Sequence, residues 1–332
     1  MKLSEFTDDN MNSTERVRNT ILGKQTDRQA VYGWVKENLS AEISEKFGSV
    51  ENFEDKYEFD AAHIFGGPWS FDSESFDKIR SFHDELTPDI LLNYDLFVSP
   101  DNDSDYEEVK KQIAHHKERE RFCYMQTPGL FEHFNTVFGI ENHLLYTALY
   151  PDELCELYAR QAEWTTKFAD KCISLGADMI HISDDWGSQK DMLFSPDTWR
   201  KIIYPNIKTI VDHVHSKGVF ASLHSDGCIR KVLDGVREIG FDVVHPWQEN
   251  ANMPLDLYLK NYSEEFAVMG GICVQSAIGI MNRENLENEI RRIFSVLKGK
   301  RWICCTSHFV QQHCSVEDLE FAYNLIYKLA RE

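Results

Sequence analysis

The chain has 332 residues, of which 42% are hydrophobic and 12% aromatic, so it is long and apolar enough to bury a large core. Its 55 acidic and 35 basic side chains give a formal net charge of −20, which argues against binding to nucleic acid or to an anionic membrane. No segment has the roughly 18 consecutive apolar residues of a membrane span, and the N-terminal residues lack a signal-peptide pattern. The eight cysteines show no disulfide-framework spacing, so we expect a cytoplasmic protein with free thiols.

In chain order, the sequence predicts a helix at residues 13–24 and then eight short apolar runs that suit buried strands. Amphipathic segments separate the later runs, and three of these segments end at Gly218, Gly240 and Gly299, as helices often do. Strands that alternate with helices indicate a parallel sheet, and eight such units predict an α/β protein with a (β/α)8 TIM barrel. The runs are 30–35, 61–66, 122–127, 178–183, 219–224, 242–247, 266–271 and 302–307.

One acidic and aromatic segment, residues 67–120, is longer than an ordinary crossover between strands. We predict that it is an insertion that carries helices and lies over the barrel mouth. No change in composition marks a linker, so residues 1–332 are expected to form a single domain with an N-terminal helical extension.

Polar, titratable or aromatic side chains follow nearly every predicted strand. Because the carboxyl ends of barrel strands meet at one mouth, we expect these side chains to form the functional site. They are Tyr32, Trp34, His63, Gln126, Asp184, Asp185, Trp186, His224, Asp226, His245, Trp247, Gln248, Gln275 and His308.

His224 and Asp226 lie two residues apart, so in an extended segment both side chains point to the same side. His308, at the end of the last predicted strand, can supply a third ligand to a metal ion. Two imidazoles and one carboxylate leave a coordination position open, which is typical of catalytic zinc, and the same set admits other divalent metals. Without a metal, His224 and Asp226 would instead form a hydrogen-bonded pair that binds a polar substrate.

Asp184 and Asp185 are adjacent, so only one of them can face the mouth from an extended chain. That carboxylate would act as a general base or orient a ligand, and the alternative for both is capping of the next helix. The remaining strand-end residues are expected to line a pocket for a small-molecule substrate. These are Tyr32, Trp34, His63, Gln126, Trp186, His245, Trp247, Gln248 and Gln275.

Four segments, DDWGSQ (184–189), SPDTWRKIIYP (195–205), HSDG (224–227) and GGI (270–272), occur in an order that resembles the uroporphyrinogen decarboxylase superfamily. The resemblance extends over roughly residues 120–330 and implies a (β/α)8 barrel. It also implies one of two activities. One is cofactor-free decarboxylation of uroporphyrinogen III, and the other is zinc-dependent methyl transfer between a corrinoid protein and an acceptor such as coenzyme M or a folate.

The decarboxylases resemble one another in an MRQAGR stretch and an FSD segment, where this sequence has VYGWVKENL and IFGGPW. Arg28, in DRQA, precedes the first predicted strand instead of following it. The methyltransferase branch has H-x-C and a later Cys, and here His224 matches the His, while Asp226 and His308 stand in the cysteine positions. The resemblance therefore favours a methyltransferase that holds zinc or another divalent metal and uses a corrinoid on a separate protein.

Two other functions remain open from the sequence, a decarboxylase of uroporphyrinogen III or another carboxylate, and a non-catalytic barrel that binds a ligand. The oligomeric state is also open, a homodimer included.

Overall fold

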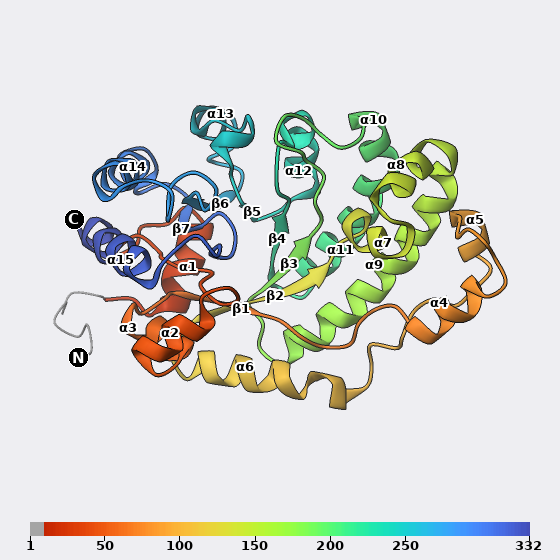
Figure 1. Cartoon of the computed structure of the whole chain (residues 1–332), viewed down its shortest axis with the longest axis horizontal. Helices are drawn as coiled ribbons and strands as arrows, with labels where there is room; N and C mark the ends of the chain where they lie inside the picture. The colour runs from red at the N-terminus through yellow and green to blue at the C-terminus, as the bar shows by residue number, and fades with distance from the viewer. Residues whose placement is uncertain (1–9) are drawn as a thin grey trace.

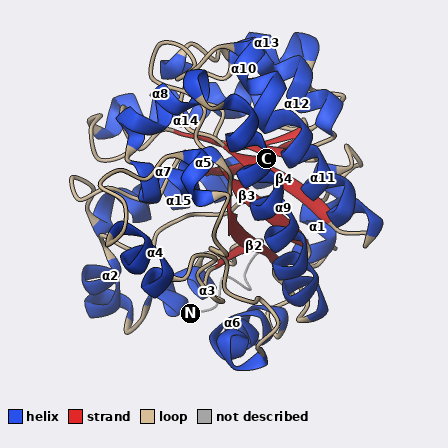
Figure 2. Ribbon diagram, turned by 90° about the vertical axis from the view of Figure 1, so that its right-hand side faces the viewer, coloured by secondary structure: helices blue, strands red, loops and turns tan. Residues whose placement is uncertain are grey.

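The computed structural model describes residues 10–332. Within them, seven parallel strands lie side by side in chain order and form a curled sheet with helices around it (Figures 1 and 2). This arrangement confirms the α/β class and the predicted barrel architecture, and the strands match seven of the eight predicted runs. They are β1 (Ala61–Ile64), β2 (Phe122–Pro128), β3 (Met179–Ser183), β4 (Phe220–His224), β5 (Val243–His245), β6 (Ala267–Ile272) and β7 (Trp302–Thr306).

The predicted first strand, residues 30–35, forms only a single parallel bridge, between Val31 and Cys304 of β7. The segment still joins both edges of the sheet, because Tyr32 N–H donates to Cys304 O (2.8 Å) and Asp60 N–H donates to Val31 O (2.8 Å). It does not extend into a strand because side chains take its other donors. Val31 N–H donates to Asp60 Oδ2 (2.8 Å), and Trp34 N–H donates to Thr306 Oγ1 (3.2 Å).

Helices cover the sheet wherever apolar side chains recur at helical spacing. In Arg283–Leu297, for example, Leu286, Ile290 and Ile293 are buried, and Asn282 caps the first turn by accepting Asn285 N–H. The α-helices are α1 (Ser13–Ile21), α2 (Ser40–Phe47), α3 (Val50–Lys56), α4 (Ser73–Arg80), α5 (Pro88–Leu91), α6 (Glu107–Lys117), α7 (Phe131–Phe138), α8 (Ile140–Leu149), α9 (Pro151–Ser174), α10 (Pro196–Thr198), α11 (Tyr204–Ser216), α12 (Leu233–Ile239), α13 (Leu255–Asn261), α14 (Arg283–Leu297) and α15 (Val316–Arg331). Short 3-10 helices span Asp103–Tyr106, Arg230–Val232 and Glu249–Ala251, and a π-helix spans Trp199–Ile203.

The insertion predicted between the first strands contains α4, α5 and α6 (Figure 1). Its first residues, 67–70, line a cavity at the carboxyl ends of β2 and β3. Helix α6 packs on β1 and β2 as a crossover helix, and α5 packs on α9. Among the described helices, none is long and apolar enough to cross a lipid bilayer.

A buried ionic network closes the opposite end of the barrel, where β1 begins. Asp60 is fully buried, and its carboxylate accepts hydrogen bonds from Arg16 Nη1 (2.6 Å) and Arg28 Nη1 (2.6 Å). Arg16 also pairs with Asp27 (2.6 Å). Asp60 therefore attaches α1 and residues 28–31 to β1. The two guanidinium groups hold the pKa of Asp60 below its ordinary value despite the opposing effect of burial.

We expect Asp60→Asn to lower the free energy of unfolding by about 3–5 kcal/mol, because it removes the carboxylate that buried Arg16 and Arg28 share, while Arg16 keeps Asp27. Urea denaturation at neutral pH measures this change. The wild-type stabilisation should be present above pH 4 or so, the ordinary range of an aspartate, and should be lost as the pH falls through the lower folded pKa.

The matched control is Asp77→Asn, which removes an exposed carboxylate 3.7 Å from Arg80. It should change the free energy of unfolding by less than about 1 kcal/mol. Equal effects of the two substitutions would contradict the role given to Asp60.

Candidate active site

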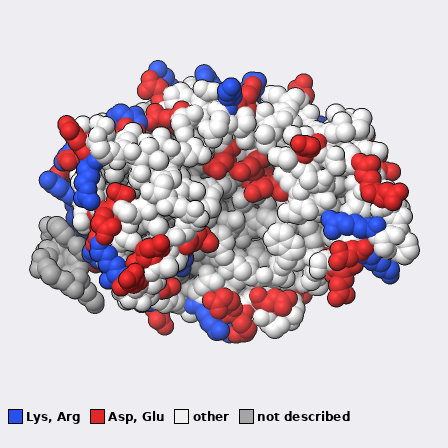
Figure 3. Space-filling view, viewed as in Figure 1, with Lys and Arg blue, Asp and Glu red and all other residues white. Residues whose placement is uncertain are grey.

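The candidate ligands lie at the carboxyl ends of β4 and β7, beside the ends of β3 and β5. The parallel register pairs Ser183 with His224 and His224 with His245, so the residues that follow these strands leave the sheet side by side. Figure 3 shows Asp and Glu side chains beside a hollow near the centre of one face, with Lys and Arg toward its edges.

His224, Asp226 and His308 each direct one ligand atom into a common group, and these three atoms lie within 4.8 Å of one another. His308 Nε2 is 3.9 Å from Asp226 Oδ2, and the rings of His224 and His308 have centroids 5.9 Å apart. Ligand atoms around a tetrahedral zinc ion are separated by about 3.3 Å, given bonds of about 2.0–2.2 Å. The three side chains would therefore need only small rotations to share an ion.

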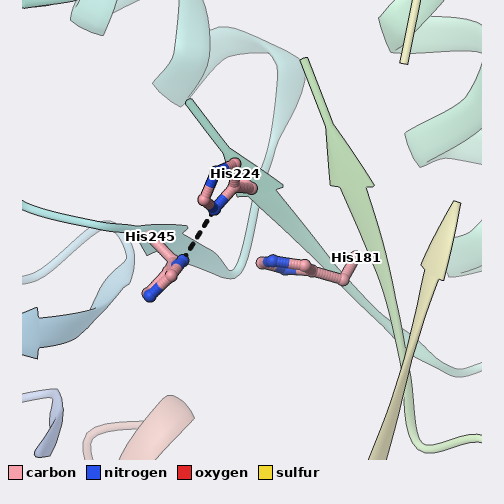
Figure 4. A group of neighbouring side chains, drawn as sticks. All are labelled: His181, His224 and His245. Atoms are coloured by element: carbon pink, nitrogen blue, oxygen red, sulfur yellow. Dashed lines mark hydrogen bonds between the residues drawn. The ribbon is translucent and has the colours of Figure 1, made fainter. Parts of the chain in front are cut away.

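Hydrogen bonds determine which ring nitrogen of His224 has a free lone pair. Figure 4 shows the one between His224 and His245. His245 Nε2 lies 3.4 Å from the carbonyl oxygen of Thr306, which can only accept, so His245 carries its proton on Nε2. Burial lowers the pKa of both rings, so both are neutral, and His245 Nδ1 must accept the proton of His224 Nδ1 at 2.9 Å. His224 Nε2 is therefore left with a free lone pair. His224 Nε2 lies 3.8 Å from Asp185 Oδ1. A cation held between these two atoms would stabilise their close approach.

A second group of imidazoles, those of His181, His224 and His245, lies deeper in the barrel (Figure 4). His181 Nδ1 is 2.6 Å from Ser222 Oγ, and its Nε2 is buried with no hydrogen-bond partner among the described residues. The Nδ1 atoms of His224 and His245 are already bonded to each other, so we assign the metal position to the outer group.

N–H groups of the backbone and of an amide side chain hold the carboxylates of Asp226 and of its neighbour Asp185. Asp226 Oδ1 accepts from Gln248 Nε2 (3.0 Å), and Asp185 Oδ1 accepts from Asp226 N–H (2.7 Å). Burial and the neighbouring Asp185 charge raise the pKa of Asp226 to about 7, and burial raises the pKa of Asp185. No Lys or Arg of the described residues forms an ion pair with either carboxylate. The group thus suits a divalent cation in its donor types and in its charge.

Two glycines let the loops after β3 and β4 touch. Gly227 has a φ of +81°, and a Cβ there would lie 2.6 Å from the carbonyl carbon of Gly187. Gln248 Oε1 accepts Gly227 N–H (2.7 Å). This contact fixes Asp226, the residue before Gly227, over the end of β4.

Asp184 and Asp185 take different positions. Asp184 is fully buried, and its carboxylate accepts Glu132 N–H (2.8 Å) and the indole N–H of Trp186 (2.6 Å). It therefore holds the first turn of α7 against β3. Of the two adjacent carboxylates, only Asp185 lies beside His224.

Several of the expected pocket residues surround the metal group. Trp34 stacks on His308 with ring centroids 5.0 Å apart, and His63 packs between Trp34 (4.7 Å) and Phe65 (4.0 Å). Gln126 lines the cavity at the ends of β2 and β3. His245 and Gln248 act on the metal group through the hydrogen bonds described above.

The structure places the other four expected pocket residues in different surroundings. Tyr32 packs in the core against Phe59 and Tyr124, and Trp186 is fully buried against Trp199. Gln275 is exposed and accepts a hydrogen bond from Asn250. Trp247 lines a separate cavity of about 330 Å³. Tyr32 belongs to the segment that forms no strand, whereas Trp186, Trp247 and Gln275 follow β3, β5 and β6.

Comparison with known proteins places the chain in a family. A family model described as uroporphyrinogen decarboxylase (URO-D) matches residues 135–329, which is more than half of the chain. The chain belongs to the URO-D family. The match begins in α7 and ends in α15, so it includes the strands β3 to β7 that carry His224, Asp226 and His308.

Individual relatives of this URO-D family protein are distant. A uroporphyrinogen decarboxylase from Nautilia profundicola is 25% identical over 189 residues, 54% of this chain and 50% of the relative, so the match spans about half of the relative's length. A solved methyltransferase from Methanosarcina mazei has 11% identity and a TM-score of 0.67, over 96% of this chain and 99% of the other. At that identity, the second likeness shows a common fold.

The arginine of the DRQA stretch is far from the candidate site of this URO-D family protein. Arg28 pairs with Asp60 at the amino end of β1, whereas the candidate ligands follow the carboxyl ends of the strands. Its guanidinium is buried by that ion pair and does not reach the mouth.

A cavity of about 350 Å³ adjoins the metal group, and we call it the Glu132 cavity. Ser183, directly before Asp184, lines it, and so does Phe65, whose ring lies 5.9 Å from that of Trp34. Sequence reasoning missed Glu132, because it lies four residues beyond the end of β2. The available signal was its place after Pro128-Gly129, in the first turn of an amphipathic helix.

We expect His245→Phe to weaken zinc binding by about 10–100-fold, since the substitution keeps a ring but removes the acceptor that orients His224. Competition with a chromogenic chelator measures the dissociation constant. His213→Phe, which alters a half-exposed histidine paired with Asp170, is the control and should leave zinc affinity unchanged. Unchanged affinity in His245→Phe would refute the orientation of His224 argued above.

Proposed function

We propose that this protein is a metal-dependent methyltransferase that works with a corrinoid held on a separate protein. The observation that supports it is the convergence of His224, Asp226 and His308, with His224 Nε2 free to bind an ion. In the methyltransferase branch, the matching positions hold the zinc ligands. The donors here are one carboxylate and two imidazoles, a set that accepts zinc and other divalent metals.

A divalent ion bound there would supply Lewis acidity that lowers the pKa of an acceptor or polarises a methoxylated donor. His224, Asp226 and His308 would hold it, and Gln248 would keep the Asp226 carboxylate in place. Asp185, beside His224 and not itself paired with Lys or Arg in the described chain, would take up the proton that the small substrate releases. Trp34 would cover His308 and exclude water from that side.

A decarboxylase of uroporphyrinogen III or of another carboxylate is the second candidate, because the family and the Nautilia relative carry that description. Two features of this chain argue against it. No Lys or Arg of residues 10–332 lines the Glu132 cavity, so carboxylate groups would find no cationic partner among them, and a cavity of about 350 Å³ suits a small ligand.

Elemental analysis tests the metal requirement. Protein purified without added metal should contain a divalent transition metal, and both His224→Ala and His308→Ala should lose it, because each removes one of three ligands. Asp226→Cys should retain metal, since a thiolate can replace the carboxylate, whereas Asp226→Ala should not. Metal that persists in both histidine variants would show that the ligands are assigned wrongly.

Turnover separates the candidate activities. With methylcobalamin as a stand-in for the corrinoid protein and a thiol as acceptor, the metal-loaded protein should change the cobalt absorbance, and His308→Ala should slow this change by about 100-fold. Formation of coproporphyrinogen from uroporphyrinogen by metal-free protein would establish the decarboxylase instead. A non-catalytic barrel would show neither reaction.

A further inference from the structure

Four side chains with rings line the Glu132 cavity, beside glycine, proline and polar residues. Phe65, Phe168 and the indole of Trp69 line it together with His133, and Trp69 is 59% exposed at its edge. The volume of about 350 Å³ lies at the small end of the range for ligand pockets. An indole so exposed beside a cavity is available to contact a ligand.

The one carboxylate that lines this cavity is fixed in position. Glu132 N–H donates to Asp184 (2.8 Å), and Ser183 Oγ donates to Glu132 Oε2 (3.2 Å). Burial, with the charges of Asp185 and Asp184, raises the pKa of Glu132 to about 8, so its carboxyl group is largely protonated at neutral pH in the empty cavity, and a bound cation would favour its ionised form.

The cavity has no cationic side chain of its own. No Lys or Arg lines it, and none in the described chain forms an ion pair with Glu132. Burial lowers the pKa of His133 to about 3, so this ring is neutral, and it stacks on Phe71 at 4.2 Å. The local field therefore repels anions and attracts a cation.

Charge balance leaves room for one positive charge. A divalent ion held by His224, Asp226 and His308 would balance the carboxylates of Asp226 and Asp185, and Asp184 is satisfied by its two N–H donors. Glu132 then remains as the carboxyl group whose ionised form a cation in the cavity would stabilise.

We propose that the Glu132 cavity binds a small organic monocation, an alkylated ammonium group, with Glu132 as its counter-ion and Trp69 as its aromatic wall. The electrons of an indole face attract an ammonium group, and a nearby carboxylate attracts it further. This inference rests on the proposed function for the divalent ion in the charge balance and for the class of substrate, and binding can be measured without methyl transfer.

Isothermal titration of the metal-loaded protein with three probes of similar shape tests the proposal. The probes are choline, its neutral isostere 3,3-dimethylbutan-1-ol, and the anion 3,3-dimethylbutanoate. Choline should bind about 10-fold more tightly than the neutral isostere, as expected for one favourable charge interaction, and the anion should bind most weakly.

Two variants connect that preference to named side chains. Glu132→Gln should abolish the preference for choline over the isostere, while Glu141→Gln, a change of an exposed residue in α8, should keep it. Trp69→Ala, at an exposed position that folding tolerates, should weaken choline binding by about 10-fold.

The inference is overturned if choline does not bind, if the isostere or the anion binds as tightly as choline, or if folded Glu132→Gln keeps the preference. Metal content, measured on the same preparations, separates this failure from failure of the proposed function. Metal-loaded wild type without a preference for choline overturns only the cavity inference. A retained preference in protein that holds no metal overturns only the metal-dependent function.

Discussion

The hydrogen bond between the Nδ1 atoms of His224 and His245 determines what the candidate site can do. The carbonyl of Thr306 in β7 fixes the proton of His245, and that proton in turn fixes the tautomer of His224. The free nitrogen of His224 consequently points toward Asp185 and the outer ligands instead of into the barrel. Residues of β4, β5 and β7 thus leave the lone pair of His224 Nε2 free. A metal ligand requires such a lone pair.

Charge is divided between the two ends of the barrel. At the amino end, Asp60 is surrounded by guanidinium groups, and the ion pairs hold the chain together. At the carboxyl end, Asp185, Asp226 and Glu132 are partly buried and have no Lys or Arg partners among the described residues. Burial without a counter-charge is unfavourable. We infer that the mouth obtains its positive charge from what it binds.

Much of the architecture could be predicted, because buried parallel strands are short apolar runs whose carboxyl ends must meet, and this rule also brought His224, Asp226 and His308 together. The sequence could not reveal that side-chain oxygens of Asp60 and Thr306 would take the donors of residues 30–35. It could not tell Asp184 from Asp185, since the choice depends on α7 packing against β3. Nor could it show which tryptophans would be core, because apolar walls and cores have the same composition.

X-ray absorption of the zinc-loaded protein tests the assignment of the ion to His224, Asp226 and His308 most directly. The account predicts a shell of nitrogen and oxygen at about 2.0–2.2 Å, outer scattering from two imidazole rings, and no sulfur at about 2.3 Å. The nearby cysteines make this a strict test, since Cys228 lies two residues beyond Asp226. A zinc–sulfur shell, or a first shell without imidazole scattering, would contradict the account.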